Sequence, residues 1–217
     1  MASPSREIRY IAIEGVIGAG KTSLSRLLAR DLDARLNLEI VEENPFLTRF
    51  YEDPRRHAFA TQIFFLLSRY RQQQEFFQQD LFQRRIVSDY LFAKDRIFAN
   101  LNLGDAELHL YERVADELHG RVPVPDLVVF LQASVDVLMV RIARRGREYE
   151  RDISRDYIAS LAEAYNHFFF HYTDSPLLVV NTNDIDFVHS PAHYDDLRRH
   201  IETPFQGVQY YTPQRER

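Results

Sequence analysis

Short apolar runs alternate with longer segments in which apolar residues recur every three or four positions. The runs lie at Ile8–Glu14, Leu38–Val41, Arg85–Asp89, Leu127–Leu131 and Leu177–Asn181. Such short runs are typical of buried strands, and the periodic segments between them are typical of amphipathic helices. The alternation predicts an α/β fold with a five-stranded parallel sheet flanked by helices on both faces. In this architecture ligands bind at the carboxyl ends of the strands.

Several helix boundaries are marked by their local residues. Asp53-Pro54 is a good N-cap and first-turn pair, and it predicts a helix that runs to about Gln78. The segment from Thr203 to Arg217 is polar and contains two prolines, so we expect it to be a poorly ordered extension. The absence of any composition break predicts one domain over residues 1–217.

A phosphate-binding loop follows the first predicted strand. The segment G-V-I-G-A-G-K-T at 15–22 fits the pattern G-x-x-x-x-G-K-[ST] at every fixed position, and a helical pattern begins directly after it. Backbone N–H groups would hold the α- and β-phosphates, the lysine would reach the β- and γ-phosphates, and the threonine would face Mg²⁺. The expected nucleotide contacts in this loop are Gly15, Gly18, Ala19, Gly20, Lys21, Thr22 and Ser23.

The overall composition limits the class of partner. The chain has 217 residues, 45% of them apolar, and a formal net charge of −5, so no general basic field favours nucleic acid. The absence of cysteine excludes disulfides and thiolate metal sites. No run approaches the length of a membrane span, and residues 1–9 lack the apolar stretch of a signal peptide. We therefore expect a cytoplasmic protein without a membrane partner.

The other predicted strand ends favour a kinase over a GTPase. A GTPase would carry D-x-x-G and N-K-x-D, whereas this chain has D-Y-L-F at 89–92 and N-T-N-D at 181–184. Glu39 lies at the end of the second predicted strand, where a carboxylate can accept the proton of an attacking hydroxyl. Alternatively, Glu39, Glu42 and Glu43 form a solvated acidic loop, and position alone leaves both interpretations open.

An arginine-rich segment, R-I-A-R-R-G-R-E-Y-E at 141–150, predicts a lid at about residues 144–153. Arg141 and Arg145 are one helical turn apart, and Gly146 is expected to end their helix so that Arg147 enters a loop. Three guanidinium groups that converge from a helix end are suited to a phosphoryl group in transfer. A solvated charged face is the alternative interpretation of this segment.

Together these residues resemble the deoxynucleoside kinase family, and within it the bacterial deoxyadenosine and deoxyguanosine kinases. Glu39 in E-I-V matches the catalytic glutamate of the family motif E-P-V, with isoleucine in place of proline. Gln62 and Arg69 match the family pattern Q-x-x-x-x-x-x-R, which by resemblance binds the edge of the base. Tyr51 and Glu150 fall where the family binds the sugar 3'-hydroxyl.

The resemblance has one clear departure after the third strand. The family usually has D-R or E-R there, with the acid near magnesium, whereas this chain has Asp89-Tyr90. The expected arginine near the nucleoside 5'-oxygen is therefore missing, and Lys94 is a candidate for its charge. Asp95 falls at the position of the family's base-reading aspartate and would pair with Arg69.

Two further positions follow from the resemblance. Phe98 is a candidate surface for stacking on the base, with helix-core packing as the alternative. Asp186 and Phe187, after the last predicted strand, resemble the loop that holds the adenine of ATP.

The resemblance implies ATP- and Mg²⁺-dependent phosphorylation of a deoxynucleoside 5'-hydroxyl by a homodimer, with purine nucleosides favoured and deoxycytidine also compatible. Glu39 would be the base, Lys21, Arg141, Arg145 and Arg147 would neutralise the phosphoryl group, and Thr22 with Asp89 would hold magnesium. Apolar helices around Leu108–Leu118 are candidates for the dimer contact. A thymidylate-type kinase and a non-catalytic nucleotide-binding module are the alternatives.

Overall fold

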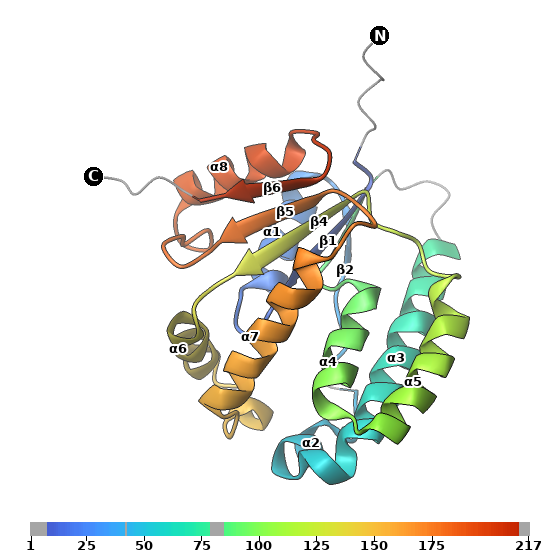
Figure 1. Cartoon of the computed structure of the whole chain (residues 1–217). Coiled ribbons are helices and arrows are strands. Elements are labelled where there is room, and N and C mark those ends of the chain that lie inside the picture. Colours follow the sequence, from blue (N-terminus) through green and yellow to red (C-terminus); the bar gives the residue numbers. More distant parts are fainter. Residues whose placement is uncertain (1–7, 42, 79–84, 213–217) are drawn as a thin grey trace.

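A computed structural model describes residues 8–41, 43–78 and 85–212. Its centre is one parallel sheet of six strands in the order β2-β3-β1-β4-β5-β6 (Figure 1). The strands are β1 Tyr10–Gly15, β2 Arg35–Asn37, β3 Ile86–Ser88, β4 Leu127–Gln132, β5 Leu177–Asn181 and β6 Val208–Tyr211. The parallel α/β prediction is confirmed, and the predicted number of five strands is one too few.

Helices cover both faces of the sheet. In chain order they are α1 Lys21–Asp31, α2 Leu47–Glu52, α3 Pro54–Gln78, α4 Asp95–Asn102, α5 Asp105–His119, α6 Val135–Arg145, α7 Arg155–Phe170 and α8 Pro191–Glu202. Two single 3₁₀ turns are η1 Phe92–Lys94 and η2 Glu148–Glu150. In Figure 1, α7 crosses in front of the strands and α1 lies behind them, while α2, α3, α4 and α5 gather to one side.

The middle strands are apolar because both of their faces are covered. In β1, Ile11 is level with Val87 of β3 and with Leu127 of β4, and all three side chains are buried. Continuous apolar runs of this kind are expected for parallel strands between two helical layers. A second apolar cluster joins α2, α3, α4 and α5 through buried residues such as Phe50, Leu66 and Tyr111.

The second strand lies earlier in the chain than predicted. It covers Arg35–Asn37 instead of Leu38–Val41, and it pairs only with β3. After Asn37 the backbone leaves the sheet, since its polar groups bond to side chains instead: the Leu38 carbonyl accepts from Gln72, and the Glu39 N–H donates to Asp89. Glu39 therefore lies on a loop beyond the strand end.

The C-terminal segment is better ordered than predicted up to Tyr211. Val208–Tyr211 forms β6, which pairs in parallel with β5 at the edge of the sheet. Tyr211 is buried, and its hydroxyl bonds to Asp196 of α8. The strand has only four residues and three of them are exposed, so neither an apolar run nor a clear alternation marks it in the sequence. Residues 213–217 lie outside the described part.

Two predicted helix ends are confirmed. Helix α3 begins at Pro54 and is described to Gln78, and the Asp53 carboxylate accepts a hydrogen bond from the Arg56 N–H at 3.3 Å. Helix α6 ends at Arg145, and Gly146 follows it with φ +65°, the left-handed conformation that glycine adopts without strain.

Candidate active site

The loop between β1 and α1 is built around glycines that no other residue could replace without a clash. A Cβ on Gly15 would lie 2.6 Å from the Leu131 carbonyl oxygen, and a Cβ on Gly20 would lie 2.9 Å from the Phe187 ring. Both glycines also have positive φ. Helix α1 begins at Lys21, so the free N–H groups of its first turn face the space above the loop.

Two cavities open on either side of this loop. The first, of about 230 Å³, lies between the loop, α2, α3 and the lid, and the second, of about 970 Å³, lies between the loop, α6 and the segment after β5. Four residues line both cavities: Lys21, Thr22, Arg145 and Arg147. A group that passes from one cavity to the other must therefore pass the lysine of the phosphate-binding loop and two lid arginines.

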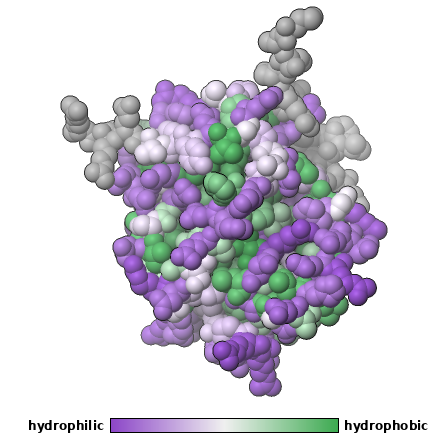
Figure 2. All heavy atoms as spheres, viewed as in Figure 1, coloured by the Kyte–Doolittle hydropathy of each residue, from purple (hydrophilic) through white to green (hydrophobic). Residues whose placement is uncertain are grey.

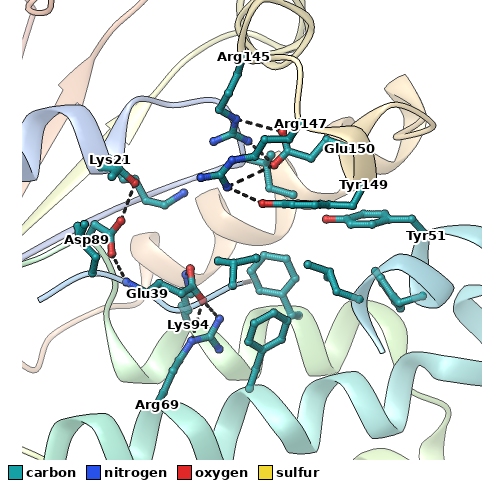
Figure 3. Close-up of a pocket in the computed structure, with 18 of the residues that line it drawn as sticks. Lys21, Glu39, Tyr51, Arg69, Asp89, Lys94, Arg145, Arg147, Tyr149 and Glu150 are labelled. Atoms are coloured by element: carbon teal, nitrogen blue, oxygen red, sulfur yellow. Dashed lines mark hydrogen bonds and ion pairs between the residues drawn. The ribbon is translucent and has the colours of Figure 1, made fainter. Parts of the chain in front are cut away.

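Glu39 lies in the first cavity between two cations. Arg69 donates through Nε to Oε1 at 2.9 Å, and Lys94 donates through Nζ to Oε2 at 2.7 Å (Figure 3). Burial alone would raise the pKa of Glu39, but the positive charges of Arg69 and Lys94 outweigh it and hold this pKa below its usual range. The Glu39 side chain is 12% exposed and both of its oxygens are bound by cations, which excludes the interpretation of Glu39 as part of a solvated loop.

Thr22 and Asp89, the predicted metal pair, are in direct contact. The Thr22 hydroxyl donates to Asp89 Oδ2 at 2.6 Å, and Asp89 Oδ1 accepts from the Glu39 N–H at 2.7 Å. Among the described residues, no cluster of three or more His, Asp or Glu could hold a metal. One carboxylate and one hydroxyl fit Mg²⁺, which takes its remaining ligands from phosphates and water.

The residues predicted to bind the base lie on one side of the first cavity, with one exception. Gln62 and Arg69 come from the same face of α3, both are buried, and both line the cavity. Phe98 also lines it. Asp95 does not: it lies behind Arg69, with which it forms a buried ion pair. Asp95 is thus placed to orient Arg69 in the cavity.

The lid covers the opposite side of the same cavity. Glu150 is 5% exposed and accepts from Arg145 Nε at 3.1 Å, while Arg147 donates through Nη1 to the Tyr149 hydroxyl at 2.7 Å (Figure 3). Tyr149 stacks on Tyr51 of α2, with ring centroids 6.5 Å apart and planes at 15°. The structure therefore brings the predicted sugar contacts Tyr51 and Glu150 together with two of the lid arginines.

Arg141 shares the second cavity with Arg145 and Arg147, but it does not reach the first cavity as they do. Its guanidinium donates to the Thr182 hydroxyl at 3.1 Å and to the Thr182 carbonyl at 2.7 Å, and it lines only the second cavity. Helical spacing placed Arg141 and Arg145 on one face of α6 correctly, but the end of β5 lies opposite Arg141 and binds it there. All three arginines therefore line the second cavity, and two of them also line the first.

The loop after β5 forms the far wall of the second cavity. Asp186 accepts hydrogen bonds from the backbone of Val188 and His189, which fixes the turn, and both Asp186 and Phe187 line the cavity. Phe187 is 4% exposed and packs against Gly20. The predicted adenine-binding loop is thus adjacent to the predicted phosphate-binding loop.

Sequence analysis missed Glu14, which lies behind the site, and Tyr149, which lines the first cavity. Glu14 of β1 is fully buried and accepts from the N–H groups of Gly15 and Leu91 and from the Tyr165 hydroxyl. A lone acid inside the apolar run Y-I-A-I-E-G was the available signal. Tyr149 carried no such signal, because an aromatic residue in a charged segment has no preferred role.

Comparison with known proteins is consistent with this geometry. The sequence profile described as deoxynucleoside kinase matches residues 11–205. This chain belongs to the deoxynucleoside kinase family. It is 31% identical to the deoxyguanosine kinase of Bacillus subtilis (strain 168) over 89% of its length and 96% of the relative. It is 36% identical to the deoxyadenosine kinase of Dictyostelium discoideum over 76% of this chain and 68% of the relative.

A solved structure of deoxyadenosine kinase from M. mycoides with bound dATP aligns with this kinase at a TM-score of 0.78 and 27% identity, over 89% of this chain and 100% of the other. The kinase is thus an enzyme that phosphorylates a deoxynucleoside at the expense of a nucleotide, and the thymidylate-type and non-catalytic alternatives are not favoured. None of its described helices is long and apolar enough to span a membrane; the cytoplasmic location stays a prediction.

Proposed function

We propose that this kinase transfers the γ-phosphoryl group of ATP to the 5'-hydroxyl of a purine deoxynucleoside in nucleotide salvage. The observation that carries the proposal is the wall shared by the two cavities. On one side of Lys21 and Thr22 lies the cavity with Glu39, and on the other lies the cavity with the loop around Phe187. The nucleoside occupies the first cavity and ATP the second, so that the γ-phosphate meets the 5'-oxygen at this wall.

Glu39 acts as the general base of the transfer. Its carboxylate takes the proton of the 5'-hydroxyl while the 5'-oxygen forms a bond to the γ-phosphorus, and the bond from that phosphorus to the β–γ bridging oxygen breaks, which leaves ADP. Lys21, Arg145 and Arg147 neutralise the charge on the phosphoryl oxygens from the shared wall. Arg141 of α6, which is bound to Thr182 directly after β5, contacts the nucleotide farther from the reacting phosphorus.

Thr22 and Asp89 are the residues that would hold Mg²⁺. When bound, the ion would neutralise phosphate charge and orient the phosphate oxygens. The hydrogen bond of 2.6 Å between Thr22 and Asp89 brings the two ligand oxygens together next to the phosphate-binding loop.

Three residue groups in the first cavity recognise the nucleoside. Arg69, oriented by Asp95, and Gln62 present donors and an acceptor to the base, a set that matches a purine edge and is also compatible with deoxycytidine. Tyr51 and Glu150, which both line the cavity, hold the sugar 3'-hydroxyl, and the bulk of the Tyr51 ring disfavours a 2'-hydroxyl. The names of the relatives, which include deoxyguanosine, deoxyadenosine and deoxyadenosine/deoxycytidine kinases, support this substrate range.

A nucleoside panel tests the proposal. ADP formation with ATP and Mg²⁺ is measured for deoxyadenosine, deoxyguanosine, deoxycytidine and thymidine, with adenosine and thymidylate as matched comparisons. We expect the highest kcat/KM for a purine deoxynucleoside and the lowest among the four deoxynucleosides for thymidine. A preference for thymidylate would contradict the assignment of the acceptor.

The ion pair of Arg69 and Asp95 gives a prediction on specificity. Arg69→Met combined with Asp95→Ala removes both buried charges and opens space near the base, where Arg69 would crowd the 5-methyl group of thymidine. We expect the ratio of kcat/KM for thymidine to that for the preferred purine to rise by about 10- to 100-fold, as a pocket effect of about 1 to 3 kcal/mol allows. Absolute rates will fall, since Arg69 also binds Glu39. An unchanged ranking would remove both residues from base recognition.

The charge of Lys21 gives a prediction on pH. Burial, together with the nearby Lys94 cation, lowers the pKa of Lys21 to about 8. Phosphate groups stabilise the protonated amine, so bound ATP raises the pKa of Lys21. At a pH above about 8 the Lys21 amine of the free enzyme is largely neutral, and it must take up a proton when ATP binds. We expect the Kd for ATP to increase as pH rises above about 8. The fall in affinity should move to higher pH in Lys21→Arg, and a Kd for ATP that is independent of pH up to 9 in the parent would contradict the assignment.

A homodimer is part of the proposal. Leu110 of α5 is 49% exposed, and hydrophobic side chains gather across the lower part of the face in Figure 2, where Figure 1 places α4, α5 and α7. An exposed apolar surface on helices that flank the sheet is suited to contact with a second copy.

A further inference from the structure

Lys94 is a buried cation whose hydrogen-bonding capacity is mostly unused by the protein. Its side chain is 3% exposed and lines the first cavity. An ammonium group has three N–H donors. One binds Glu39 Oε2 at 2.7 Å, and the next carboxylate, Glu14, is 3.9 Å away, which is too far for a hydrogen bond. Within the described part of the chain, the structure gives the Lys94 amine no other acceptor.

The local fold keeps this amine in place. Lys94 ends the 3₁₀ turn η1, which follows Asp89 after only a few residues, and its N–H bonds to the Leu91 carbonyl. Glu14 fixes the start of the turn by accepting the Leu91 N–H at 2.7 Å. A turn anchored at both ends places the ammonium between the end of β1 and the Glu39 loop.

Lys94 is the one cation that lines the first cavity among residues 89–98, all of which the structure describes. Tyr90, the residue directly after Asp89, is fully buried and points away from the cavity. Its hydroxyl accepts from Asn37 at 3.3 Å and donates to Gln72 at 3.2 Å, in a polar cluster between β2 and α3. Lys94 is thus the cation that the segment after β3 contributes to the cavity.

Lys94 contacts the oxygen of Glu39 that is available to act as the general base. Arg69 donates to Glu39 Oε1 through both Nε and Nη2, which uses both lone pairs of that oxygen, whereas Oε2 accepts one hydrogen bond and keeps a lone pair that can receive the 5'-hydroxyl proton. Lys94 is bound to that same oxygen. The 5'-oxygen that approaches Oε2 must therefore come within reach of the two unused N–H donors of Lys94.

Resting on the proposed function, we propose that Lys94 is a catalytic residue that donates hydrogen bonds to the 5'-oxygen and to the phosphoryl group as the new bond forms. Lys21 and the lid arginines approach the phosphoryl group from the wall shared with the ATP cavity, whereas Lys94 approaches it from the nucleoside side. As negative charge moves onto the phosphoryl oxygens, the ammonium is drawn toward them and its interaction with Glu39 weakens. The Glu39 carboxylate then becomes a stronger base as it takes the proton of the 5'-hydroxyl.

Lys94→Gln is the decisive variant, because a glutamine amide can still donate to Glu39 but carries no charge. We expect kcat to fall by about 100-fold or more, while the Kd for the deoxynucleoside and the KM for ATP change by no more than a few fold. Lys94→Met should lose at least as much, and Lys94→Arg should retain more activity than either. The matched control is Arg96→Gln, since Arg96 is an exposed cation on α4 that pairs with Asp116 at 2.5 Å; its kcat should equal that of the parent.

The measurements are kcat and KM by ADP formation, nucleoside Kd by calorimetry, and Tm as a check of folding. If either the glutamine or the methionine variant does not fold, the other decides. A folded variant with kcat within about threefold of the parent would overturn the proposal, as would a raised nucleoside Kd with unchanged kcat. In both cases an active parent leaves the kinase assignment intact; a parent that phosphorylates no deoxynucleoside would instead refute the proposed function.

Discussion

Glu39→Gln is expected to reduce kcat for deoxynucleoside phosphorylation by about 100-fold or more, with nucleoside binding largely retained. The substitution keeps the size of the side chain and one oxygen that can accept from Arg69, but it removes the atom that takes the proton. Binding persists because the base and the sugar contact other residues, such as Gln62 and Tyr51. The measurement is kcat by ADP formation together with nucleoside Kd by calorimetry.

Glu43→Gln is the control for this experiment, since Glu43 is an exposed carboxylate in the same loop. It should leave kcat unchanged. The glutamine at position 39 leaves Lys94 without its nearest carboxylate, so Tm is measured for both variants. Parent-like turnover in Glu39→Gln would exclude Glu39 as the base.

Lys21→Ala is expected to reduce kcat by about 1,000-fold or more and to weaken ATP binding, with the fold preserved. Lys21 lines both cavities, and its amine donates to the Gly15 carbonyl at 2.7 Å, directly beside the path of the phosphoryl group. Its side chain belongs to neither apolar cluster, so truncation creates no core cavity. Activity, Kd for ATP and Tm are measured on the same preparation.

Arg30→Ala provides the matched comparison, because Arg30 is an exposed cation on the same helix that pairs with its neighbour Asp31. This variant should have parent-like kcat and Tm. A large loss of Tm in Lys21→Ala alone would mean that the hydrogen bonds of Lys21 to the Gly15 and Val16 carbonyls hold the loop together.

Glu39 lies at the expected edge of the sheet although the limits of its strand were predicted wrongly. Its strand was placed three residues too late, yet the carboxylate still lies beyond the carboxyl end of a strand and next to Asp89. The reason is topological: in a parallel sheet every loop that follows a strand opens on the same edge, so the side chains of different loops meet there whatever the strand limits.

The helical spacing of the arginines predicted which face of α6 they share, but not which residues they bind. It placed Arg141 and Arg145 on one face of α6, but it could not reveal that Thr182 of a distant segment would bind the first and Glu150 the second. Partner choice of this kind depends on contacts between residues far apart in sequence, and periodicity carries no information on them.

The sequence by itself determined the parallel α/β class, the phosphate-binding loop, the limits of α3, the C-terminal end of α6 and many of the residues that line the two cavities, because each depends on contiguous residues or on fixed local spacing. Only the tertiary structure decided the edge strand β6, the place of Asp95 behind Arg69, the contact of Arg141 with Thr182, and the contact of Lys94 with Glu39. These features are set by packing between remote segments, where burial and the need to pair every charge select one arrangement from several that the local pattern allows.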